Sequence, residues 1–95
     1  MFKELDPLLH SQLRLAIVSL LLSVDKADFV FIKEKTEATA GNLSVQIEKL
    51  SEAGYIEVDK FIDGKRPRTV CKITKKGVAA FDSYVKALQD YIGKK

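Results

Sequence analysis

The chain has 95 residues, enough to bury a modest core, and 46% of them are apolar, which excludes a disordered protein. A formal net charge of only +3 permits nucleic acid as a partner without demanding one. The single cysteine excludes an internal disulfide and, with the single histidine, leaves no convincing metal cluster, so we expect neither a metal nor a cofactor.

A first helix is predicted from about residue 8 to residue 23, with Asp6 as its N-cap and Pro7 near its start. Its apolar residues lie on more faces than a surface helix of a small monomer needs, so we expect it to pack on two sides. The apolar residues Phe29–Ile32 fit either a short strand or the start of a helix. The polar tail Lys33–Glu37 favours a short second helix.

A third helix is predicted to begin at its N-cap, Thr39, and to turn Leu43, Ile47 and Leu50 toward the core. Gly54 fits the C′ position, where a left-handed residue ends a helix at little cost.

A hairpin and a last helix follow. The strands Tyr55–Phe61 and Thr69–Ile73 are separated by the segment Asp63–Arg68, which has turn chemistry and dense positive charge. Thr74 is expected to cap a helix over about residues 75–91, whose apolar face is formed by Phe81, Val85, Leu88 and Ile92. The order of these elements predicts an α+β fold that is mostly helical, in one domain over residues 1–95.

Positive charge is concentrated in the hairpin and at the start of the last helix. Between residues 60 and 76, Asp63 is the one acid among the cations Lys60, Lys65, Arg66, Arg68, Lys72, Lys75 and Lys76. Such a cluster would release counterions on binding phosphates. A solvated hairpin with solubilising lysines explains the charge alone equally well.

The outward face of the third helix favours DNA binding over a hairpin that is merely solvated. Its early turns are small, polar and uncharged, with Asn42, Ser44, Val45 and Gln46 exposed and Lys49 following. Asn and Gln can pair with adenine edges, and a small apolar side chain can touch a thymine methyl group. Together with the basic hairpin, this face predicts a helix whose N-terminal half enters a major groove.

Several segments, in this order and spacing, resemble the winged helix-turn-helix transcriptional regulators, and within them the small MarR-like and ArsR-like regulators. These segments are Gly41–Ser44, Leu50 with Glu52–Ile56, Gly64–Thr69, and Ile73–Thr74 with Gly77. The sequence departs from that pattern at Gln46, where many relatives have histidine, at Glu37, where glycine often ends the second helix, and at Thr36, which replaces a usual leucine.

The resemblance implies a winged helix-turn-helix fold with a three-helix core, a two-stranded β-wing and a C-terminal dimerisation helix. It makes the helix from Thr39 to Ala53 the recognition helix and the loop Asp63–Arg68 the wing, which reaches the DNA backbone or minor groove. The residues expected to contact DNA are Thr39, Asn42, Ser44, Val45, Gln46, Lys49, Lys65, Arg66 and Arg68. The first and last helices would form a homodimer through Leu9, Leu13, Ile17, Leu20, Phe81, Tyr84, Val85, Leu88 and Tyr91.

The implied function is sequence-specific transcriptional regulation, as a repressor, by a homodimer on a pseudo-palindromic operator. The alternative is a winged-helix module that binds protein or RNA; the charge of the wing favours nucleic acid. Cys71 could be a redox sensor or a small core residue, and His10 a pH-sensitive interface group or a partly exposed side chain.

Enzyme activity is not expected. His10 and Cys71 lie on separate elements, and no glycine-rich phosphate loop follows a strand. No signal peptide is visible, and the apolar run Leu15–Leu22 is too short to span a bilayer, so we expect a soluble, cytoplasmic protein.

Overall fold

The computed structural model describes residues 2–93 of the chain. The elements follow in the order α1 (Gln12–Leu22), β1 (Ala27–Asp28), α2 (Phe29–Thr36), α3 (Ala40–Glu52), β2 (Ile56–Asp63), β3 (Arg66–Ile73) and α4 (Lys75–Tyr91). The predicted α+β, mostly helical fold is confirmed. None of the helices described is long and apolar enough to cross a lipid bilayer.

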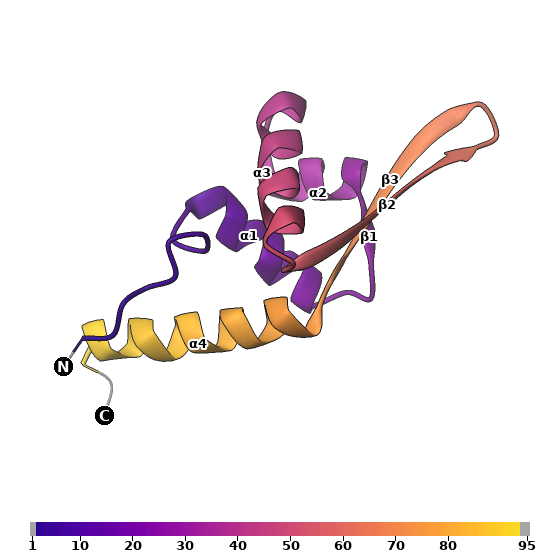
Figure 1. Ribbon diagram of the computed structural model, residues 1–95. Helices are drawn as coiled ribbons and strands as arrows, with labels where there is room; N and C mark the ends of the chain where they lie inside the picture. The colour runs from indigo at the N-terminus through magenta and orange to yellow at the C-terminus, as the bar shows by residue number, and fades with distance from the viewer. Residues whose placement is uncertain (1, 94–95) are drawn as a thin grey trace.

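The hairpin of β2 and β3, together with the short β1, forms an antiparallel sheet in the order β1-β3-β2 beside the helices (Figure 1). The hairpin projects from one end of the molecule and α4 projects from the other, so the longest dimension is 54 Å. The first turn of α3 and the tip of the hairpin both point away from α4 (Figure 1). The two predicted DNA-binding elements therefore share one side of the molecule.

The core is built around α1, which packs against α2, α3, β3 and α4, as its several apolar faces predicted. Its buried residues Ile17, Val18 and Leu21 meet the inward faces of the other elements. The core comprises Leu9, Ile17, Val18, Leu21, Ala27, Ile32, Leu43, Ile47, Leu50, Ile56, Cys71 and Tyr84.

The first helix begins later than predicted, at Gln12 rather than near residue 8. Asp6 does not cap it: its carboxylate accepts a hydrogen bond from the backbone N–H of Leu8, and its carbonyl accepts one from His10, which closes a separate turn. Ser11 then adopts an extended conformation with φ of −151°, and this breaks the helical path.

The strand β1 was not predicted. Only Ala27 and Asp28 form it, paired with Cys71 and Val70 of β3, and two residues are too few to show an alternating pattern. The ambiguous segment Phe29–Ile32 begins a helix, because the Asp28 carboxylate accepts the backbone N–H of Phe31 at 2.8 Å and so caps α2. The preference for a second helix there is confirmed.

The end of α3 has the geometry predicted for Gly54, whose φ is +82°. The N–H of Gly54 donates to the carbonyl of Ser51 and the N–H of Tyr55 to that of Leu50, which together make a Schellman motif. The left-handed glycine turns the chain from α3 directly into β2.

The start of α4 is tied to this turn. The Thr74 hydroxyl accepts the N–H of Gly77 at 3.0 Å, as predicted for its N-cap, and donates to the carbonyl of Gly54 at 2.6 Å. The backbone N–H of Thr74 donates to the carbonyl of Tyr55 at 3.1 Å. Gly77 lies so close that a Cβ atom there would sit 2.1 Å from this same carbonyl oxygen. Glycine at position 77 is thus required by packing.

The loop of the hairpin is shorter than predicted. Asp63 pairs with Arg66 across the strands, so Gly64 and Lys65 alone form the turn, and Arg66–Arg68 belong to β3. Gly64 has φ of +66° at the first central position, as a type II′ hairpin turn requires. The tight turn makes the wing a continuous two-stranded finger.

The helix α4 spans Lys75–Tyr91, close to its predicted range, but it turns a different apolar stripe inward. Its buried residues are Gly77, Tyr84 and Ala87. The predicted stripe of Phe81, Val85, Leu88 and Ile92 runs alongside and is half-buried to exposed, with Ile92 70% exposed. Sequence periodicity identified an apolar face without identifying what it packs against.

Candidate nucleic-acid interface

The helix α3 is held with its apolar stripe inward and its early turns in solvent. Leu43, Ile47 and Leu50 are at most 5% exposed, and the hydroxyl of Thr39 caps the helix by accepting the N–H of Asn42 at 3.2 Å. Anchoring by the core and the cap fixes which side chains face outward. The predicted recognition helix therefore has the orientation that the sequence implied.

The outer face of α3 is polar and accessible in its first turns. Thr39, Asn42, Ser44 and Lys49 are exposed, and Val45 is 49% exposed. Acidic residues enter only with Glu48 and Glu52 in the later turns. The N-terminal half of the helix thus combines the positive end of the helix dipole with small uncharged side chains, an arrangement that suits phosphate and base edges.

Gln46 differs from its neighbours because it is half-buried and held by other side chains. Its Oε1 accepts a hydrogen bond from Nη1 of Arg14 at 2.5 Å, and its Nε2 donates to Oδ1 of Asn42 at 2.9 Å. Arg14 is held in turn by a 2.6 Å hydrogen bond from its Nε to the carbonyl of Leu8. From the sequence, Arg14 resembles part of the family's first helix, and it was not expected to take part in DNA binding.

The tip of the wing carries accessible positive charge. Lys65 lies in the turn and Arg66 is the first residue of β3; both are exposed. Neither side chain has a salt-bridge partner among residues 2–93. These cations are available to an external anion.

Arg68, predicted as a third cation of the same kind, has two carboxylate partners. Its guanidinium contacts Asp28 at 2.8 Å and Asp63 at 3.1 Å. Because Asp28 also caps α2, this contact ties the base of the wing to the helical core. Arg68 acts first as a brace for the wing, and Asp28 is a second participant that the sequence did not reveal.

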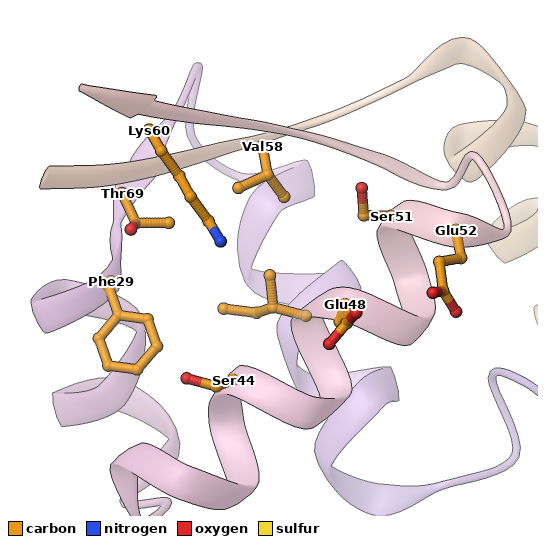
Figure 2. Close-up of a pocket in the computed structure, with 9 residues that line it drawn as sticks. Phe29, Ser44, Glu48, Ser51, Glu52, Val58, Lys60 and Thr69 are labelled. Carbon is orange, nitrogen blue, oxygen red and sulfur yellow. The ribbon is translucent and has the colours of Figure 1, made fainter.

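A hollow of about 470 Å³ separates α3 from the wing (Figure 2). Lys60 of β2 reaches into it toward α3, while Phe29 and Thr69 line its other side (Figure 2). Ser44 and Glu48 form the flank of α3 that faces this hollow. Neither Asn42 nor Gln46 lines this hollow; Gln46 instead contacts Arg14 of α1, so α3 offers two chemically different edges.

The two candidate sensor residues have ordinary structural surroundings. Cys71 is fully buried, and burial raises the pKa of its thiol to about 11, which keeps it protonated and unreactive. His10 places its Nδ1 3.0 Å from the hydroxyl of Tyr84, where the N-terminal turn meets α4. No cluster of metal-ligating side chains occurs within residues 2–93.

The residues predicted for a dimer interface divide into two groups. Leu9, Ile17 and Tyr84 are at most 5% exposed within a single chain, so they belong to its own core and have no surface to offer a second copy. Leu13, Leu20, Phe81 and Val85 are half-buried, while Leu88 and Tyr91 are 37% and 48% exposed. Only this second group remains available to a partner.

Comparisons with known proteins identify the family. The family model described as "winged helix DNA-binding domain" matches residues 13–92. An uncharacterised protein of Methanocaldococcus jannaschii is 38% identical over 76 residues, which cover 80% of this chain and 83% of that protein.

Solved structures of similar proteins agree with this family assignment. A transcriptional regulator homologue from Pyrococcus horikoshii OT3 is 34% identical with a TM-score of 0.82, over 90% of this chain and 85% of that chain. A mutant of MarR from E. coli, solved with operator DNA, is 20% identical with a TM-score of 0.70, over 90% of this chain and 66% of that chain. At this identity, the similarity to MarR shows a shared fold and nothing more. As its resemblance to the winged helix-turn-helix regulators predicted, the chain belongs to the winged helix DNA-binding domain family.

Proposed function

We propose that this protein is a homodimeric transcriptional repressor that binds a pseudo-palindromic operator. The early turns of α3 enter the major groove, and the wing contacts the backbone or the adjacent minor groove. The observation that carries this proposal is that the first turn of α3 lies on the same side of the molecule as the tip of the hairpin (Figure 1), while Asn42, Ser44 and Val45 of α3 and Lys65 and Arg66 of the hairpin are exposed.

The relatives support this assignment. The Pyrococcus protein of 34% identity is described as a transcriptional regulator homologue, and the MarR neighbour was solved on operator DNA. Repression is the simplest outcome for a small dimer, because its occupancy of an operator excludes other proteins from that DNA.

The exposed stripe of α4 supports the dimer. Val78, Phe81, Val85, Leu88 and Ile92 are spaced alternately by three and four residues, the spacing by which helices pair along a seam. Val78 is 44% exposed and Leu88 37% exposed, although both are large and apolar. A second copy would bury this stripe and, in a two-fold dimer, set two α3 helices about 34 Å apart, one turn of DNA.

The test measures the salt dependence of duplex binding for the wild type and for Arg66→Ala. Loss of one phosphate contact should lower affinity for all sequences alike and reduce the slope of log K against log salt by about one unit. The control is Lys86→Ala, which removes the same charge from α4, where Lys86 is exposed beside Asp82. We expect its slope to match that of the wild type. Absence of duplex binding at low salt would refute the proposed function, and equal slopes for Arg66→Ala and wild type would remove Arg66 from the interface.

A protein-binding module is the second candidate, and the apolar side chains of the wing favour it. Phe61 is 43% exposed and Ile62 is 69% exposed on β2. Retention on duplex DNA at low salt decides between the candidates, because an apolar protein-binding wing gives no reason for strong retention.

A further inference from the structure

A row of hydrogen bonds runs from α1 onto the outer face of α3 and ends at an exposed amide. Arg14 donates to Gln46, and Gln46 donates to Asn42, at 2.5 and 2.9 Å. Arg14 is itself fixed by its Nε, which donates to the carbonyl of Leu8 at 2.6 Å. The row thus begins at an anchored guanidinium and ends where the helix meets solvent.

The chemistry of arginine determines the direction of this row. A guanidinium can only donate hydrogen bonds, whereas a neutral amide can both donate and accept. Gln46 must therefore turn its oxygen toward Arg14 and its nitrogen toward Asn42. Asn42 in turn directs its oxygen at Gln46, which leaves its Nδ2 without a hydrogen-bond partner among residues 2–93. Two amides alone could be arranged in either sense, and Arg14 removes that choice.

We propose that Arg14 is a specificity-determining positioning residue, which fixes the row so that α3 presents amide donors outward. This inference rests on the proposed function, DNA binding through α3. In a major groove, outward donors find acceptors at O6 and N7 of guanine, at O4 of thymine and at N7 of adenine. Beside its N7, however, adenine carries the N6 amino group, a donor that an amide nitrogen cannot pair. The paired contact with adenine needs an amide oxygen beside an amide nitrogen, but the oxygens of Asn42 and Gln46 face protein donors. The base read by Asn42 is therefore guanine or thymine, rather than the adenine that side-chain type alone suggested.

A purely structural or phosphate-binding role for Arg14 predicts a different result. Loss of a phosphate contact weakens binding equally for all sequences and leaves the preferred motif unchanged. Loss of a residue that orients the amides instead lets Gln46 and Asn42 reverse, so the preferred base changes at one position of the motif.

The experiment selects binding sites from a random duplex library for the wild type and several variants. Asn42→Ala identifies the position that Asn42 reads, because sequence preference is lost there. At that position we expect guanine or thymine for the wild type. For Arg14→Met we expect adenine to gain roughly 5- to 150-fold relative to guanine, the equivalent of one paired contact. Lys86→Met, which removes a charge from exposed α4, should keep the wild-type motif.

A second variant reverses the row without removing Arg14, and so tests the proposal even if Arg14→Met fails to fold. In Gln46→Glu the new carboxylate only accepts hydrogen bonds, so it accepts from Arg14 and from Nδ2 of Asn42 and turns the Asn42 oxygen outward. We expect the preference at the Asn42 position to change to cytosine or adenine, which carry donors. An adenine preference in the wild type, or one motif shared by the wild type and Gln46→Glu, would overturn the proposal.

A measurement without DNA separates failure of this inference from failure of the proposed function. In the ¹H–¹⁵N spectrum of the unbound protein, Gln46→Glu should move the side-chain amide signals of Asn42, because their hydrogen-bonding role reverses. Unmoved signals would overturn the inference whether or not the protein binds DNA. Moved signals with no duplex binding would support the row and refute its proposed use in reading bases.

Discussion

Replacement of Gly77 by alanine tests the packing between α4 and the turn that follows α3. The new Cβ would lie 2.1 Å from the Tyr55 carbonyl oxygen and 2.9 Å from Cγ1 of Ile73, so α4 must retreat by roughly 0.9 Å to restore the 3.0 Å below which real Cβ contacts essentially never occur. That shift strains two hydrogen bonds of Thr74, to the carbonyls of Tyr55 and Gly54. Overpacking costs about 1–3 kcal/mol and each lost hydrogen bond about 0.5–1.5 kcal/mol.

The expected destabilisation from Gly77→Ala is about 1–5 kcal/mol, after allowing about 1 kcal/mol for the better helix propensity of alanine. For a chain of this size, each kcal/mol lowers Tm by roughly 4–8 °C. Urea and thermal unfolding, followed by circular dichroism at one fixed protein concentration, measure the effect. The matched control is Gly41→Ala, also within a helix but with no atom within 4 Å of the new Cβ, which should stabilise the protein slightly. If both variants were as stable as the wild type, the packing argument would be wrong.

Three further predictions concern pH, strain and assembly. Burial raises the pKa of Cys71 from 9.0 to about 11. Burial, and to a lesser extent the hydrogen bond and charge of Asp6, raise the pKa of Tyr55 from 10.0 to about 12. Urea unfolding should therefore show full stability below pH 9 and declining stability as the pH rises toward 12. Tyr55→Phe should remove the decline above pH 10 that the tyrosine causes, and an unchanged profile would argue against that assignment. Glu37 has φ of +59°, so Glu37→Gly should stabilise the protein by roughly 0.5–1 kcal/mol, measured by the same unfolding, and a destabilised variant would contradict this. Leu88→Asp should convert a dimer into a monomer in sedimentation at micromolar concentration, while Lys86→Ala should not; a monomeric wild type would refute the proposed dimer.

Elements whose determinants are adjacent in the chain could be predicted closely. The caps formed by Thr39 and Thr74 and the helix end at Gly54 depend on backbone groups within a few residues. The types of these residues therefore marked where α3 begins, where it ends and where α4 begins. At Glu37, which departs from the glycine that the resemblance implied, the backbone adopts a left-handed conformation with φ of +59°.

Contacts between residues distant in the chain could not be predicted from single residue types. Arg14 lies 32 positions from Gln46, and Arg68 lies 40 positions from Asp28. Sequence reasoning therefore treated Gln46 and Arg68 as side chains directed only at DNA, although both have partners within the protein. In α4, two apolar stripes offset by one residue are equally periodic, so the pattern alone could not decide which of them faces the core.

These internal partners change how the positive charge of the wing should be counted. Arg68 is bound by two carboxylates, and Lys72 lies 3.5 Å from Glu57 on the neighbouring strand. Lys60, Lys65 and Arg66 have no such partners among the residues described, so the charge available to a phosphate lies at the tip of the finger and at Lys60, which reaches into the hollow beside α3. A tip charge can be effective only if the finger has a defined direction. The contact of Arg68 with Asp28, which caps α2, supplies that direction. Arg68 is partly neutralised by its carboxylate partners, but it still helps to position Lys65 and Arg66, which are not.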